Sequence, residues 1–142
     1  MRALLDVNVL IALHDRDHVH HLLAGEWLAR NVAKGWASCP LTQNGCLRIM
    51  SQAGYPNAQP LGLLVGMLQG ATSSEIHAFW PDDVSMLDAA QYHHAHIHSS
   101  RQITDLYLLG LAVKHGGRLV SFDRRIPLSA VKGASDKHLV LL

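Results

Sequence analysis

Short apolar runs alternate with longer helical stretches along the whole chain, and this alternation limits the folds that the chain can adopt. We expect strands over five runs: Ala3–Leu5, Trp36–Cys39, Ile76–Trp80, Arg118–Phe122 and His138–Leu142. Helical patterns lie between them, over Val7–Leu13, Val19–Val32, Pro40–Gln52, Leu61–Leu68 and Ile103–His115, with Val84–His98 expected to be helical or partly irregular. Such alternation is typical of a parallel sheet with helices on both faces. The sequence therefore predicts an α/β protein, a three-layer α/β/α sandwich with a mainly parallel sheet.

The length and composition favour one domain that is partly covered by a partner. A chain of 142 residues is long enough for a single core, so we expect one domain over residues 1–142. Only 16% of the residues are charged, which leaves room for apolar surface. Leu61–Leu68 is apolar over about two turns, more than one core-facing stripe requires. We therefore expect this helix to form a homodimer contact.

Three aspartates adjoin the most apolar segments and are the strongest functional signal. Asp6 follows the first predicted strand, Asp105 lies near the start of the last helix, and Asp123 follows the fourth strand. A carboxylate is costly to bury unless a cation balances its charge. Carboxylate oxygens are preferred ligands of hard divalent cations, and α/β proteins commonly bind ligands at the carboxyl ends of their strands. The three aspartates therefore predict a divalent metal site in a hydrolase.

Each aspartate also has a purely structural interpretation. Asp6 can cap the helix that follows it, because an aspartate at a helix N-terminus accepts hydrogen bonds from backbone N–H groups. The charge of Asp105 can interact favourably with the positive N-terminal end of its own helix, and Asp123 can initiate a turn. Their placement beside three different core segments favours the metal site over three separate local roles.

The sequence shows no signal for secretion, a membrane or disulfide bonds. The N-terminal apolar stretch contains Asp6 and lacks a cleavage-like site, and no segment is long and apolar enough to span a membrane. Cys39 and Cys46 form neither a C-x-x-C pair nor a disulfide framework. We therefore expect a cytoplasmic protein.

Charge is unevenly distributed, although the net charge is only +1. Residues 101–142 carry seven Lys and Arg against three acidic residues. If metal neutralises two of those acids, this part of the molecule offers a basic rim to a phosphate backbone. Ordinary solvated Lys and Arg side chains are an equally good explanation of the pattern.

Eleven histidines raise the alternative of a zinc site. His94 and His98 in the cluster His93–His98 are four residues apart, a spacing that places two imidazoles on one helix face. The segment lacks the Glu of the H-E-x-x-H motif and any cysteine pair, so a solvated polar face is favoured. RNA-stacking candidates are Trp36, Trp80, Tyr92 and Arg124, although rings at such positions are more often core.

Several of these segments together resemble a known family. The stretches LLDVNVLIAL, PLTQNGCLRI and TDLYLLGLAVKHGGRLVSFDRR, in this order and spacing, are similar to PIN-domain proteins of the VapC toxin group. The resemblance covers nearly the whole chain. It implies a compact α/β/α sandwich and a Mg²⁺- or Mn²⁺-dependent endoribonuclease whose RNA-cleaving site is blocked by a small antitoxin protein.

The resemblance also implies roles for particular residues. Asp6, Asp105 and Asp123 match the family's acidic positions and would bind the metal. Asn8 and Ser121 match polar positions that would orient ligands or water. The family usually has a glutamate where this chain has Gln43, which removes one negative charge from the site.

The Gln43 substitution leaves a second function open. An active site with one fewer carboxylate holds a divalent cation less tightly, so the chain can instead be a degenerate PIN module that binds RNA or antitoxin with weak or no catalysis. A third hypothesis is a phosphohydrolase of another α/β type with Asp6 as covalent nucleophile. It ranks lowest, because Asn8 stands where a second acid is expected.

Overall fold

The sheet of the protein is fully parallel and has its first strand at the centre. The computed structural model describes all residues 1–142. Its strands are β1 (Ala3–Leu5), β2 (Trp36–Ser38), β3 (His77–Phe79), β4 (Arg118–Ser121) and β5 (Leu139–Leu141). Their order in the sheet is β3-β2-β1-β4-β5, and every neighbouring pair is parallel. All five predicted strands are therefore present, each within one or two residues of its predicted range.

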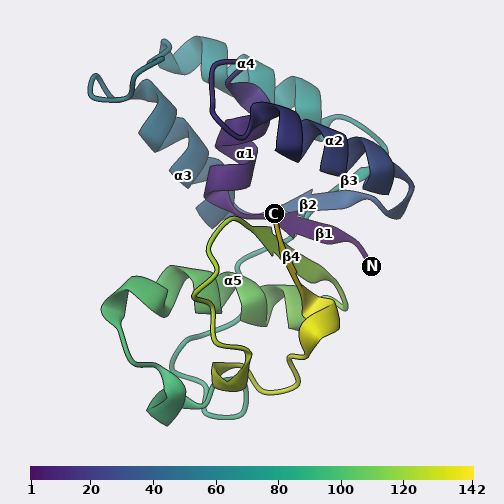
Figure 1. Cartoon of the computed structure of the whole chain (residues 1–142), viewed down its shortest axis with the longest axis vertical. Coiled ribbons are helices and arrows are strands. Elements are labelled where there is room, and N and C mark those ends of the chain that lie inside the picture. Colours follow the sequence, from purple (N-terminus) through teal and green to yellow (C-terminus); the bar gives the residue numbers. More distant parts are fainter.

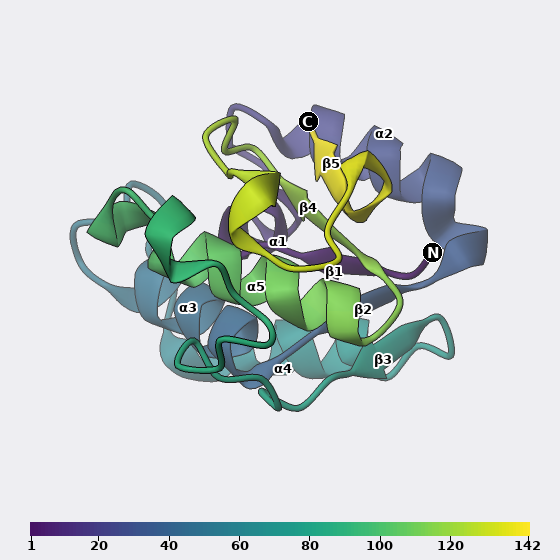
Figure 2. The same ribbon diagram turned by 90° about the horizontal axis from the view of Figure 1, so that it is seen from below.

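Helices cover both faces of this sheet and complete the predicted three layers. The helices α1 (Val7–His14), α2 (His21–Asn31), α3 (Pro40–Ser51) and α4 (Leu61–Thr72) lie on one side, and α5 (Ile103–Lys114) lies on the other (Figure 1). The view from below shows α5 running across the sheet next to β1, β2 and β4 (Figure 2). The α/β/α sandwich predicted from the sequence is confirmed. None of the helices is long and apolar enough to cross a membrane.

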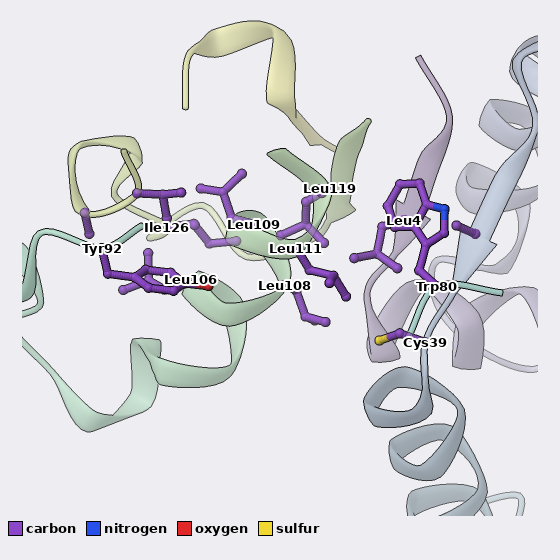
Figure 3. Packing of buried hydrophobic residues seen from close by; sticks show 14 residues of the cluster. Leu4, Cys39, Trp80, Tyr92, Leu106, Leu108, Leu109, Leu111, Leu119 and Ile126 are labelled. Carbon is purple, nitrogen blue, oxygen red and sulfur yellow. The ribbon is translucent and has the colours of Figure 1, made fainter. Parts of the chain in front are cut away.

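The two faces of the strands bury two separate hydrophobic clusters. Leu4 and Leu119 point towards the α5 side and join a cluster with Leu108 and Leu111 (Figure 3). Their chain neighbours, such as Leu5, point the other way, into a cluster with residues of α1 and α4. A fully buried leucine stabilises a fold by about 1.5–3 kcal/mol. Because both faces of the central strands are covered, these strands are apolar throughout rather than alternating.

Two glycines end the segments that precede β2 and β4. Gly35 has a φ of 74° and directly precedes β2, and Gly116 has a φ of 66° after α5. This left-handed conformation is strained for other residues and is common just after a helix. The sequence predicted a helix end at both positions, and the structure confirms it.

The segment between β3 and α5 is the least regular part of the fold. Over residues 84–98 the chain forms a short 3₁₀ turn, His94–His96, and a single antiparallel bridge between Tyr92 and Val131. The interpretation that His94 and His98 share one helix face is therefore wrong, because Ile97 between them has an extended backbone. The His94 ring instead contacts the backbone oxygen of Met86, and the His96 ring contacts that of Ser129.

The three aromatic residues considered for base stacking belong to the core. Trp36, Trp80 and Tyr92 are each less than 10% exposed. Tyr92 lies across Gly110 of α5. A Cβ on this glycine would stand only 2.6 Å from the ring atom Cζ of Tyr92. The irregular segment is thus anchored to α5 by a buried ring, and the core interpretation of these aromatic residues is correct.

Candidate active site

The parallel sheet brings the three aspartates together. Asp6 directly follows β1, Asp123 lies two residues after the adjacent strand β4, and Asp105 lies in the first turn of α5. The strands β1 and β4 are paired in register, so their carboxyl ends meet at the same edge. All three aspartates line one pocket of about 620 Å³.

The local roles of the aspartates coexist with their place in this pocket. Asp6 is the N-cap of α1, and its Oδ1 accepts a 2.7 Å hydrogen bond from the backbone N–H of Val7. The Oδ1 atom of Asp123 accepts a 2.8 Å bond from the backbone N–H of Arg125, which closes a turn. The capping interpretation of Asp6 and the turn interpretation of Asp123 are therefore correct. They do not exclude metal binding, because a carboxylate oxygen that accepts one hydrogen bond keeps a second lone pair.

Ser121 links the carboxylate of Asp6 to the backbone of Asp123. It is fully buried at the end of β4, and its hydroxyl donates a 2.7 Å hydrogen bond to Oδ2 of Asp6. The Oγ atom of Ser121 in turn accepts a 3.0 Å bond from the backbone N–H of Asp123. Ser121 thus fixes the orientation of Asp6 and the start of the turn that carries Asp123.

The three carboxyl groups differ in their pKa values. Burial raises the pKa of Asp6, in spite of the hydrogen bond from Ser121. Burial, followed by the charges of Asp6 and Asp123, raises the pKa of Asp105 to about 7. The backbone N–H of Arg125 holds the pKa of Asp123 below its usual value. Without a bound cation, Asp123 is therefore charged at neutral pH and Asp105 takes up a proton readily.

The opposite wall of the pocket is one face of α3. Leu41, Asn44, Gly45, Arg48 and Ile49 contribute this wall. Their spacing of three or four residues places them on one side of the helix. A Cβ on Gly45 would stand 2.8 Å from a methyl group of Val7, so the glycine lets α3 approach the start of α1. Asn44 and Arg48 were missed in the sequence, although their i, i+4 spacing beside Gly45 was visible.

Gln43 lies outside this pocket. Its side-chain amide donates a 2.9 Å hydrogen bond to the hydroxyl of Ser38, and it lines a separate small cavity on the α4 side of α3. Asn8 and Thr104 do line the pocket of the three aspartates. In this structure the polar groups beside the carboxylates are therefore Asn8, Asn44, Arg48 and Thr104, and Gln43 is held away by Ser38.

The donor chemistry of the pocket fits a hard divalent cation. Its titratable ligands are carboxylates alone, with amide and hydroxyl oxygens beside them and no histidine or cysteine. Burial and the charges of Asp6 and Asp123 raise the pKa of Asp105 more than the charge of Arg125 lowers it. The side chains do not form a closed cluster, since no three His, Cys, Asp or Glu residues converge as a set of metal ligands. Mg²⁺ tolerates such an open site because it commonly retains several of its waters.

The remaining candidate metal groups lie elsewhere. No histidine lines the pocket of the aspartates. Cys39 and Cys46 are free and buried, and burial raises the pKa of both thiols to about 11. Neither residue type offers an alternative site to the three aspartates.

Comparison with known proteins places the chain in a family. The PIN domain family matches residues 3–133. Ribonuclease VapC44 of Mycobacterium tuberculosis is 49% identical over 142 residues, the full length of both chains. Ribonuclease VapC39 of the same species is 40% identical over 134 residues, covering 94% of this chain and 96% of the relative.

A solved structure has the same fold at low sequence identity. A crystal structure of VapBC2 from Rickettsia felis bound to a DNA fragment from its promoter contains a chain with a TM-score of 0.57 and 16% identity. The match covers 100% of this chain and 98% of the other. At this identity the match bears on the fold alone. Taken with the two full-length relatives, the family match shows that the chain belongs to the PIN domain family, in its VapC group.

Proposed function

We propose that the protein is a metal-dependent endoribonuclease that cleaves RNA phosphodiester bonds and acts as the toxin of a toxin–antitoxin pair. One observation carries the proposal: Asp6, Asp105 and Asp123 come from three separate elements and line one pocket. The two full-length relatives are named as ribonucleases, which supports the same activity here. The expected cofactor is Mg²⁺ or Mn²⁺, held by the three aspartates.

The residues around the pocket have different roles in binding and in orienting the carboxylates and the RNA. Asp6, Asp105 and Asp123 would hold a divalent cation, which would supply positive charge for the phosphate and for the charge that develops in the transition state. Ser121 holds Asp6 by a 2.7 Å hydrogen bond, which orients this carboxylate towards the end of β4. Asp123 stays ionised at neutral pH, because the backbone N–H of Arg125 stabilises its charge. Asn8, Asn44 and Thr104 offer amide and hydroxyl groups to the RNA or to water.

The experiment that tests this function is cleavage of total RNA by the purified protein in Mg²⁺, Mn²⁺ or EDTA. Asp6→Asn keeps the size of the side chain and removes its charge, so we expect cleavage in Mg²⁺ by the parent and none by the variant. Glu75→Gln, an exposed carboxylate before β3, serves as the matched control. Equal cleavage by the parent and Asp6→Asn would contradict the proposal.

The second candidate function is a module that binds RNA or antitoxin with little catalysis. It is favoured by the position of Gln43, since neither this residue nor any other on α3 adds a carboxylate to the pocket. Replacing Gln43 by Glu tests this candidate. A large gain in Mg²⁺-dependent turnover over the parent would identify the missing charge as the limit on catalysis. A parent that already cleaves RNA, with no gain in Gln43→Glu, would show that three carboxylates suffice.

Two protein partners belong to the same proposal. Leu61 and Leu63 on α4 are more than half exposed, whereas Leu64 and Leu68 of the same helix are buried. The two exposed leucines support the homodimer contact expected over Leu61–Leu68, because exposed large apolar side chains favour a covered surface. A small antitoxin with an arginine that enters the carboxylate pocket would block the site. A monomer at micromolar concentration would contradict the dimer.

A further inference from the structure

A second, smaller pocket adjoins the one that contains the three aspartates. Ser99, Arg101, Gln102, Asp123 and Arg125 line it, and its volume is about 240 Å³. We call it the flanking pocket. Asp123 lines both pockets, so the two are neighbours on either side of this carboxylate. We propose that the flanking pocket binds an RNA phosphate next to the bond that is cleaved, with Arg101 as its main ligand; this rests on the proposed ribonuclease function.

The charges of the two pockets are opposite. The pocket of the three aspartates contains three carboxylates and one arginine, Arg48. The flanking pocket contains two arginines and one carboxylate. An RNA strand is repelled by the first pocket until a cation neutralises it, and it is attracted by the second. The flanking pocket therefore provides the binding energy that brings a polyanion to an acidic centre.

The two arginines are not equivalent. The Nε atom of Arg125 lies 3.4 Å from Oδ1 of Asp123, and its backbone N–H binds the same oxygen. Part of its charge is therefore already used within the protein. Arg101 is exposed and has no ion pair and no side-chain hydrogen bond. Its guanidinium is the free cation of the flanking pocket and can bind a phosphate through two parallel hydrogen bonds.

Local hydrogen bonds hold the segments that carry the arginines. The hydroxyl of Ser99 accepts a 3.2 Å bond from the backbone N–H of Arg101. Gln102 accepts a 3.1 Å bond from the backbone N–H of His98, and its amide donates a 3.5 Å bond to the backbone oxygen of Arg125. The segment before α5 is thereby tied to the turn after β4, so the pocket exists before RNA arrives.

The lining of the flanking pocket selects phosphate rather than base. It has no apolar or aromatic residue, so it offers no surface on which a base can stack. Arginine, serine and glutamine side chains are donors that bind phosphate and sugar without reading the base. The pocket is therefore a site of sequence-independent affinity, and the choice of target RNA is made elsewhere.

Arg101→Gln is the variant that tests the proposal, because Arg101 contacts none of the three aspartates. We expect the KM for RNA cleavage in Mg²⁺ to rise about five- to tenfold with kcat almost unchanged, since a ground-state phosphate contact is lost. Arg30→Gln, an exposed arginine on α2, is the control and leaves KM unchanged. Arg125→Gln is less informative, because it also removes a donor from Asp123.

A binding measurement separates this proposal from the ribonuclease function. A short fluorescent oligoribonucleotide of randomised sequence is titrated with Asp6→Asn and with Asp6→Asn/Arg101→Gln over a range of salt concentrations. Loss of one phosphate contact lowers the slope of log K against log salt by about 0.7. If the parent cleaves RNA but Arg101→Gln changes neither KM nor this slope, the flanking pocket is wrong and the ribonuclease function stands. If the parent neither cleaves nor binds RNA, both are overturned.

Discussion

Asp105 carries its charge at a cost to the stability of the protein. Its pKa is raised from an ordinary value of 3.8 to about 7, first by burial and then by the charges of Asp6 and Asp123. Below pH 4 the group is protonated in both the folded and the unfolded chain. As the pH rises towards 7, the unfolded chain releases this proton and the folded protein retains it, so the free energy of unfolding falls.

We therefore expect Asp105→Asn to be more stable than the parent at pH 8 in EDTA. The gain is about 1–2 kcal/mol after allowance for solvent screening of a partly exposed group, and it vanishes near pH 4. Thermal unfolding across this pH range measures it, with Glu75→Gln as the control. RNA cleavage by Asp105→Asn should be lost, so stability and activity change in opposite directions. A parent and variant of equal stability at pH 8 would contradict the raised pKa.

Ser121 is the second residue whose replacement has a defined outcome. Ser121→Ala removes the donor to Asp6 and the acceptor for the backbone N–H of Asp123, both in a buried place. We expect a loss of about 2 kcal/mol of stability in denaturant unfolding, with reduced RNA cleavage. Ser129→Ala, at an exposed serine, should have neither effect. Normal cleavage by Ser121→Ala would show that Asp6 keeps its orientation without this hydroxyl.

At the scale of elements, the position of α3 depends on one glycine. Alanine is about 1 kcal/mol more favourable than glycine inside a helix, so Gly66→Ala on α4, where a Cβ has open space, should stabilise the protein. Gly45→Ala should destabilise it by about 1–3 kcal/mol, because its Cβ would meet Val7. Cleavage should fall only in Gly45→Ala, since this variant moves the wall that carries Asn44 and Arg48. Similar stabilisation of both variants would contradict the role of Gly45.

The sequence predicted the elements well where one local pattern determined them. Ala3–Leu5 and Arg118–Ser121 are buried on both faces, and a continuous apolar run indicates such strands directly. The segment 84–98 has no such pattern, since it is positioned by long-range contacts, among them that of Tyr92 with Gly110 of α5 and the bridge of Tyr92 with Val131. Burial of an aromatic ring against a glycine of another element leaves no periodic signal.

In the site too, a local sequence pattern indicated some residues, whereas packing between distant elements determined others. Asp6, Asp105 and Asp123 were recognisable because each interrupts or ends an apolar segment, and the structure brings them into one pocket. Their catalytic role stays a prediction. Asn44 and Arg48 were not recognised, because their contribution depends on how closely α3 approaches α1. The orientation of Gln43 towards Ser38 likewise could not be read from the order of residues.

At the scale of the whole molecule, cation binding should be coupled to folding. We expect Mg²⁺ to raise the melting temperature of the parent by a few degrees, because a ligand of the folded state stabilises it by mass action. The increase should be larger at pH 8 than at pH 6, since protons compete for Asp105 below its pKa of about 7. NaCl of equal ionic strength is the control. An equal rise in Asp6→Asn would show that Mg²⁺ binds elsewhere.

The central position of β1 has a consequence for the timing of synthesis. The strand β1 pairs with β4, which is synthesised more than a hundred residues later, and Asp105 and Asp123 belong to this later part of the chain. An unfinished chain that stops before β4 contains Asp6 but cannot build the pocket around it. The nascent chain therefore cannot form the pocket of the three aspartates until β4 and Asp123 have been synthesised.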